Sequence, residues 1–193
     1  HGYTLVADAK AFRMSRTAKN QKDFKVVALS GWRKDSEYAV LCAPYFQYPS
    51  KSSQIYAQGL EHNVCLLSWE HLIFLIENGI EETPALSFAP LWNFCDAYAH
   101  RVLCADMKKS FIEPFNSVVL ELTGMTRDMF DARLNAQAAV VIERGEREKL
   151  FWKEEIAQIQ EYTKEQAISE LIKAKKIREK ISQIEAYVRG LQV

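Results

Sequence analysis

The sequence of 193 residues lacks any apolar run of about 18 or more residues, the length that a membrane-spanning helix needs. It also shows no secretory leader, so we expect no membrane partner. Its four cysteines form no CxxC pair and match no zinc-site spacing. Cys42 and Cys65 lie inside apolar runs, where a free thiol is usual, so the cysteine pattern predicts a reducing, cytoplasmic setting.

The sequence also has no net excess of either charge, because 25 lysines and arginines balance 25 aspartates and glutamates. A globally basic protein is thus excluded, and any argument for nucleic-acid binding must rest on local charge. One local excess runs from Lys10 to Lys25 and contains six cations and a single acid, Asp23. Apolar residues make up 48% of the chain, which is enough for a sizeable core.

The first half of the sequence alternates strand-like and helix-like patterns. Strands are predicted at residues 3–10, 38–43 and 64–68, and helices at 20–34, 50–60 and 69–77. This order favours an α/β fold in which helices flank a sheet. Ser68 and Gly79 are expected to begin and end the third helix. The apolar stripe of the first helix is predicted to be Phe24, Val27, Ala28, Gly31 and Trp32.

The second half is nearly all helical in pattern from about Asp106 onwards, with Thr126 and Thr163 as predicted N-caps. Dense, balanced charge between Glu143 and Arg189 is typical of the solvated face of packed helices. The spacing of the apolar residues does not hold a strict heptad, so a coiled coil is not expected. The predicted buried stripe is Ile168, Leu171, Ile172, Ile177, Ile181, Ile184, Tyr187 and Val188.

Asp8 and Lys10 stand two residues apart at the end of the first predicted strand, so their side chains share one face. A carboxylate there can hold a divalent ion, with the carbonyl of Ala9 as a second oxygen. The lysine can lie beside the same phosphate and orient or deprotonate an attacking water. The alternative interpretation is an exposed ion pair at the end of a strand.

The segment from Gly2 to Trp32 resembles the HindIII family of type II restriction endonucleases, above all in Leu5–Lys10 and Ser15–Lys25. Further similar segments are Tyr38–Leu41, Phe46–Pro49, Ser68–Leu72, Leu91–Phe94 and, more faintly, Phe151–Lys153 and Glu165–Ile168. The resemblance implies a restriction-endonuclease-like mixed sheet with a C-terminal helical subdomain. Residues 1–94 would be the C-terminal part of the nuclease core, with the DxK strand and the DNA-reading loop, and residues 95–193 the mainly helical subdomain.

The same resemblance implies a homodimer of the PD-(D/E)xK nuclease class that uses Mg²⁺ to cut double-stranded DNA at the palindrome AAGCTT. A cognate DNA methyltransferase would belong to the same system. Asp8 and Lys10 match the second acid and the lysine of the motif, and Asp23 matches an acid with a secondary metal or supporting role. The family's first acid comes from an earlier strand, and no residue here matches it, which implies an N-terminally incomplete chain. Two alternatives therefore stay open: a DNA-binding fragment that does not cleave, and a helical interaction module.

The basic segment after Lys10 has the side chains that DNA readout needs. Asn20 and Gln21 carry amides that can pair with adenine N6 and N7, although Asn20 can equally be a plain helix N-cap. Most contacts from the cations are expected to reach phosphate. The candidate DNA-binding residues are Arg13, Ser15, Arg16, Thr17, Lys19, Asn20, Gln21 and Lys22. The tryptophans, by contrast, are interpreted as core or interface aromatics.

Overall fold

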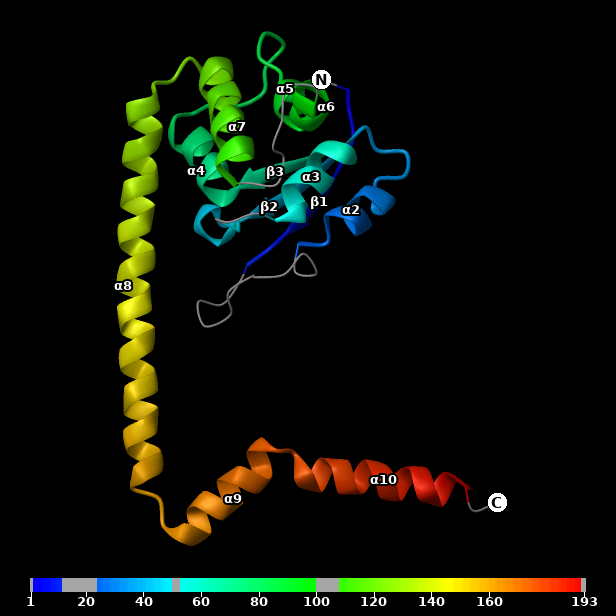
Figure 1. Cartoon of the computed structure of the whole chain (residues 1–193), viewed down its shortest axis with the longest axis vertical. Coiled ribbons are helices and arrows are strands. Elements are labelled where there is room, and N and C mark those ends of the chain that lie inside the picture. The colour runs from blue at the N-terminus through cyan, green and yellow to red at the C-terminus, as the bar shows by residue number, and fades with distance from the viewer. Residues whose placement is uncertain (1, 12–23, 50–52, 100–107, 192–193) are drawn as a thin grey trace. The chain divides into compact units, whose positions relative to one another are not determined.

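The computed structural model describes residues 2–11, 24–49, 53–99 and 108–191. The chain divides into two compact units, the first ending at Val141 and the second beginning at Ile142. Figure 1 labels the elements, which are β1 (Leu5–Ala9), α2 (Val26–Trp32), β2 (Tyr38–Ala43), a 3-10 turn (Tyr45–Gln47), α3 (Gln54–Glu61), β3 (Val64–Ser68), α4 (Trp69–Glu77), α5 (Ala89–Trp92), α6 (Phe94–Ala99), α7 (Lys108–Thr123), α8 (Arg127–Gln160), α9 (Lys164–Ala174) and α10 (Ile177–Leu191).

The three described strands form a parallel sheet in the order β1-β2-β3. Every residue of β3 is buried, and so is all of β2 after Tyr38, because these strands are covered on both faces. Continuous apolar runs are what parallel strands of this kind require, and the strands predicted from them are confirmed. β1 instead alternates between exposed and half-buried residues. The α/β fold class with helices around a sheet is confirmed.

The buried face of the helix α2 differs from the predicted one, and the predicted helix start at residue 20 lies outside the described residues. Lys25 has a left-handed φ of 50° and the helix begins at Val26. This start brings Val26 and Leu29 into the core, together with Phe24 just before them. Val27 and Trp32 are 49% and 52% exposed. Ala28 and Gly31 are exposed as well, so the predicted stripe was right only for Phe24. The helix packs against all three strands, as Figure 1 shows.

The helices α3 and α4 confirm two predicted helices, and α4 also confirms its predicted cap. Ser53 caps α3, whose Ile55, Tyr56 and Leu60 are buried. Ser68 ends β3 and caps α4, and Gly79 follows that helix with a φ of +63°. Later helices complete the core with apolar side chains that are at most 2% exposed, namely Leu91 of α5, Phe94 and Cys95 of α6, Phe111, Ile112, Phe115 and Val119 of α7, and Phe130 of α8.

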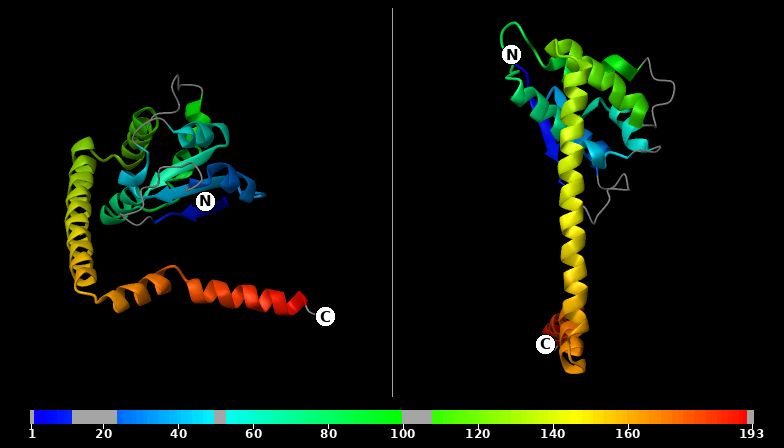
Figure 2. Two further views of the ribbon diagram at one scale, coloured as in Figure 1. Left: turned by 60° about the horizontal axis from the view of Figure 1, so that its bottom comes forward. Right: turned by 90° about the vertical axis from the view of Figure 1, so that its left-hand side faces the viewer.

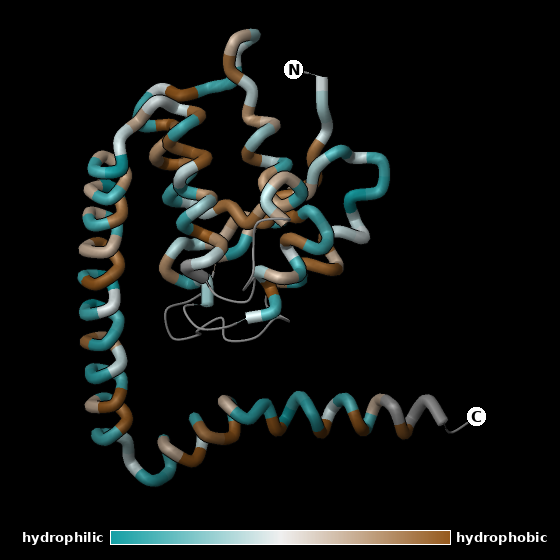
Figure 3. Tube along the Cα trace, turned by 45° about the horizontal axis from the view of Figure 1, so that its top comes forward, coloured by the Kyte–Doolittle hydropathy of each residue, from teal (hydrophilic) through white to brown (hydrophobic). Residues whose placement is uncertain are grey.

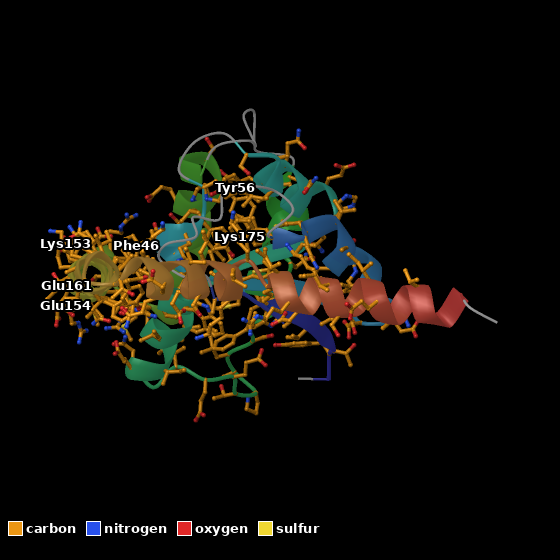
Figure 4. The ribbon with its side chains drawn as sticks, turned by 90° about the horizontal axis from the view of Figure 1, so that it is seen from below. Phe46, Tyr56, Lys153, Glu154, Glu161 and Lys175 are labelled. Carbon is orange, nitrogen blue, oxygen red and sulfur yellow. The ribbon has the colours of Figure 1, made fainter. Side chains whose placement is uncertain are left out.

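The second unit comprises the rest of α8, α9 and α10. Figure 2 shows α8 as one unbroken helix. Figure 4 views that helix end-on, with Lys153 and Glu154 of α8 labelled beside Glu161, which directly follows the helix. Thr163 caps α9 in a capping box with Gln166, which confirms that predicted helix start. No described helix is long and apolar enough to span a membrane.

The predicted buried stripe of the last two helices was wrong, because its described members are largely exposed. Ile168 and Leu171 of α9 are 49% and 54% exposed, and Ile184 of α10 is 63% exposed. The side chain of Tyr187 lies outside the described residues. The hydrophobic and hydrophilic residues do alternate along α10, as Figure 3 shows. The amphipathic pattern is therefore present, and among the described residues of this unit the principal packing partner of α10 is α9.

Candidate active site

The end of β1 brings the predicted acid and lysine together. Asp8 pairs in register with Leu41 of β2, and the amide of Lys10 donates to the carbonyl of Cys42 at 2.8 Å. The Lys10 ammonium lies 2.5 Å from Oδ2 of Asp8. Both side chains are mostly buried, at 18% exposed for Lys10 and 17% for Asp8. The prediction that they share one face of the strand is confirmed, although the exposed ion pair weighed as an alternative is in fact mostly buried.

The Asp8 carboxylate has the properties of a cation ligand. Its Oδ2 atom is buried and, among the described residues, has no hydrogen-bond donor besides the nearby lysine. A buried anionic oxygen is costly without a cation, and here the Lys10 ammonium supplies the neutralising charge. The same oxygen has the chemistry of a ligand for a divalent ion. Mg²⁺ is commonly held by one or two carboxylates together with substrate phosphates and water, so a single acid fits that ion. The described residues contain no cluster of three or more acids, histidines or cysteines.

The backbone at Ala9 adds a second oxygen at the same place. Alternate residues of a parallel strand direct their amide and carbonyl groups to the same neighbour. Because Lys10 bonds to Cys42 and Thr4 accepts from Tyr38, the even-numbered residues of β1 face β2. The carbonyl of Ala9 therefore faces away from β2. Ala9 stands between the two candidate catalytic residues in the sequence. Its carbonyl fits the role of metal ligand that we predicted for it from the sequence.

The first turn of α4 closes over the same edge of the sheet. The indole N–H of Trp69 donates to the carbonyl of Lys10 at 2.9 Å. The carboxylate of Glu70, which is only 2% exposed, accepts from the amide of Tyr45 at 2.7 Å. Sequence reasoning missed both residues as part of the site. Their position directly after a buried strand was the available signal, since the carboxyl ends of parallel strands meet at one edge.

His71 fixes this turn of α4 from the inside. Its Nδ1 accepts from the amide of Ser68 at 3.1 Å, so the proton resides on Nε2, which lies 2.8 Å from Oδ1 of Asn116. Burial lowers the pKa of His71 from 6.5 to about 4, and the contact with Asn116 opposes that shift. A neutral, fully buried imidazole with both nitrogens in hydrogen bonds supports a structural role.

The remaining predicted site residues lie outside the described part of the chain. This applies to Asp23, the candidate secondary metal ligand, and to the basic segment after the strand. The candidate DNA-binding residues in question are Arg13, Ser15, Arg16, Thr17, Lys19, Asn20, Gln21 and Lys22. Their roles stay predictions, and so does the division of the chain at residues 94 and 95.

Comparison with known proteins gives consistent results. The family model described as HindIII restriction endonuclease matches residues 1–188. The type II restriction enzyme HindIII of Haemophilus influenzae is 45% identical over 190 residues. That alignment covers 98% of this chain and 63% of the Haemophilus protein, so the chain spans less than two thirds of its relative's length.

Proposed function

The chain belongs to the HindIII restriction endonuclease family, and on that premise we propose that it is a type II site-specific deoxyribonuclease. The observation that carries the proposal is the mostly buried pair of Asp8 and Lys10 at the carboxyl end of β1. An acid and a lysine on one strand face are the arrangement of the PD-(D/E)xK class. The substrate is double-stranded DNA, and the reaction is hydrolysis of a phosphodiester bond in each strand.

Each residue of the site has a proposed role in that hydrolysis. Asp8 would hold Mg²⁺, with the carbonyl of Ala9 and the carboxylate of Asp23 as further ligands. When bound, the ion lowers the pKa of water and neutralises charge on the phosphate and the leaving oxygen. Lys10 would lie beside the scissile phosphate and orient the attacking water. The ion pair between Lys10 and Asp8 supports this role, because it holds the ammonium at the carboxylate that would bind the ion.

Recognition of the palindrome AAGCTT is proposed for the basic segment that follows β1. The amides of Asn20 and Gln21 suit adenine, and an arginine or lysine suits guanine O6 and N7. The other cations would position the duplex through its phosphates, and the hydroxyls of Ser15 and Thr17 can do the same. The support is the local excess of positive charge that follows Lys10 directly in the sequence.

The proposed assembly is a homodimer, since a two-fold symmetric protein matches a palindromic site. Its measured mass would be twice the 22.2 kDa of the chain, which light scattering can test. We also propose a cytoplasmic location, in keeping with the buried free thiols of Cys42, Cys65 and Cys95. A cognate DNA methyltransferase is proposed as the partner system, because an enzyme that cuts a short palindrome needs its host's own sites to be protected.

The decisive experiment is plasmid cleavage with Asp8→Asn, which keeps the size of the side chain and removes its charge. We expect discrete fragments from the wild-type protein only with Mg²⁺ and only from DNA that contains AAGCTT. Asp8→Asn should lower the cleavage rate at least about 100-fold, the usual scale for the loss of an acid-base or metal-positioning group. The matched control is Asp35→Asn, an exposed position in the loop before β2, which should cleave like the wild type.

Two other outcomes would contradict the proposal and favour an alternative. Site-specific binding without Mg²⁺-dependent cleavage would favour a DNA-binding fragment that does not cut. An absence of both activities would favour a helical interaction module. Binding measured at several salt concentrations separates these two cases, because phosphate contacts release counterions and make the affinity fall steeply with salt.

A further inference from the structure

An indole N–H donates a hydrogen bond near each end of β1. At the beginning of the strand, Nε1 of Trp92 donates to the hydroxyl of Tyr3 at 2.7 Å. At its end, Nε1 of Trp69 donates to the carbonyl of Lys10 at 2.9 Å. The two contacts have similar lengths, but only the second touches a proposed catalytic residue.

The regular bonding between β1 and β2 stops at Lys10 for a reason that the sequence supplies. Carbonyls of even-numbered β1 residues accept from β2 amides, as the carbonyl of Thr4 does from Tyr38. In a parallel pair this pattern repeats every two residues, so the carbonyl of Lys10 would next accept from residue 44. That residue is Pro44, which has no amide hydrogen. The Lys10 carbonyl therefore needs another donor, and Trp69 provides it.

The donor itself is firmly placed. Ser68 caps α4 immediately before Trp69, with its side chain accepting from the amide of His71 at 3.1 Å. Glu70, immediately after Trp69, accepts from the amide of Tyr45, the first amide beyond Pro44. The first turn of α4 thus supplies a donor for the end of β1 and an acceptor for the chain leaving β2.

We propose that Trp69 is a positioning residue for cleavage, because it supplies the hydrogen bond that Pro44 removes and so fixes Lys10 beside Asp8. The proposal rests on the proposed function, in which Lys10 lies at the scissile phosphate. The geometry predicts that loss of the indole donor displaces Lys10 without changing the rest of the protein's DNA-binding surface. The catalytic rate should therefore fall while the KM for DNA stays nearly constant.

The test compares Trp69→Phe with Trp92→Phe, since each change removes one indole donor from one end of β1 and keeps an aromatic ring. For Trp69→Phe we expect kcat to fall about 10- to 100-fold, the scale for small misplacement of a catalytic group. Its KM should stay within about twofold, on the same reasoning. For Trp92→Phe we expect kcat within about twofold of the wild type, because its bond lies far along the strand from Lys10. Hydrogen exchange provides a readout independent of cleavage, and the Lys10 amide should exchange faster only in Trp69→Phe.

The second part of the test restores a hydrogen-bond donor at position 44. Pro44→Ala places an amide hydrogen where the strand pattern needs one, so the Trp69→Phe, Pro44→Ala double variant should recover most of the lost kcat. Should Trp69→Phe unfold at the assay temperature, the double variant decides: kcat near the wild-type value supports the proposal, and kcat at least about 10-fold lower overturns it. An unchanged kcat in Trp69→Phe, or equal losses in the two tryptophan variants, would also overturn it.

Failure of this proposal can be told from failure of the proposed function. Loss of cleavage in Asp8→Asn with full cleavage in Trp69→Phe overturns the positioning role alone. Full cleavage by Asp8→Asn overturns both, because Lys10 would then have no catalytic partner to be positioned against.

Discussion

The first unit contains the amphipathic helix α3, and the second contains the amphipathic helix α10. Isoleucine side chains on these two helices differ strongly in burial. Ile55 of α3 is 0% exposed, whereas Ile181 of α10 is 50% exposed. The helix α3 packs against β3 and α6, whereas among the described residues of its own unit α10 packs mainly against α9. Helical periodicity therefore predicts that a face is apolar. Only the neighbouring elements decide whether that face is covered.

The largest expected effect in this comparison is that of Ile55→Ala. Removing a buried isoleucine side chain loses transfer free energy and leaves a cavity, so we expect the free energy of unfolding to fall by about 2–5 kcal/mol. Urea unfolding followed by circular dichroism measures this change. A loss below about 1 kcal/mol would mean that the first unit is as loosely packed at this position as the second, and the comparison would fail.

The pH dependence of stability should arise in the first unit, because the second unit contains no histidine. Burial lowers the pKa of His71 to about 4 in the folded protein, from 6.5 in the unfolded chain. Below pH 6.5 the unfolded chain binds a proton that the folded chain does not. The contribution of His71 is therefore complete above this pH and is lost as the pH falls towards 4, by about 3 kcal/mol in all.

The measurement is urea unfolding at several pH values for the wild type and for His71→Gln. Glutamine suits the same position of a capping box but does not titrate, so the variant should lose the slope between these two pH values. Equal slopes in the two proteins would show that His71 is not the group responsible.

The smallest expected effect is that of Ile181→Ala, the same chemical change as Ile55→Ala at an exposed position. We expect the free energy of unfolding to change by no more than about 0.5 kcal/mol. Thermal and urea unfolding at two protein concentrations check this expectation. A loss of 1 kcal/mol or more, growing with concentration, would show that another chain covers this face in solution.

The sequence predicted the sheet well because residues at the ends of β2 and β3 mark where these strands stop. Pro44 ends the apolar run of β2, and Ser68 both ends β3 and caps the helix that follows. The buried face of α2 could not be predicted in the same way. It depends on the left-handed backbone of Lys25, which separates Phe24 from the helix beginning at Val26 and changes the positions that face inward.

The candidate site was predictable only where its residues are close in sequence. Asp8 and Lys10 are two positions apart, and strand geometry alone places them on one face. Trp69 lies 59 residues from Lys10. Its contact with Lys10 can be predicted only if β1 and β3 are known to end at the same edge of the sheet. Local sequence patterns do not contain that information. Glu70 escaped notice for the same reason, since its partner Tyr45 belongs to the turn after β2.

Pro44 and Trp69 also have a consequence for how this sequence can change over time. One residue removes a hydrogen-bond donor from the sheet edge, and the other supplies it from a different element. If Trp69 has the proposed positioning role, we expect the two positions to be epistatic: loss of the tryptophan should be tolerated better where residue 44 has an amide hydrogen. Among relatives we expect the pair to co-vary, with tryptophan at the helix start wherever proline ends the strand.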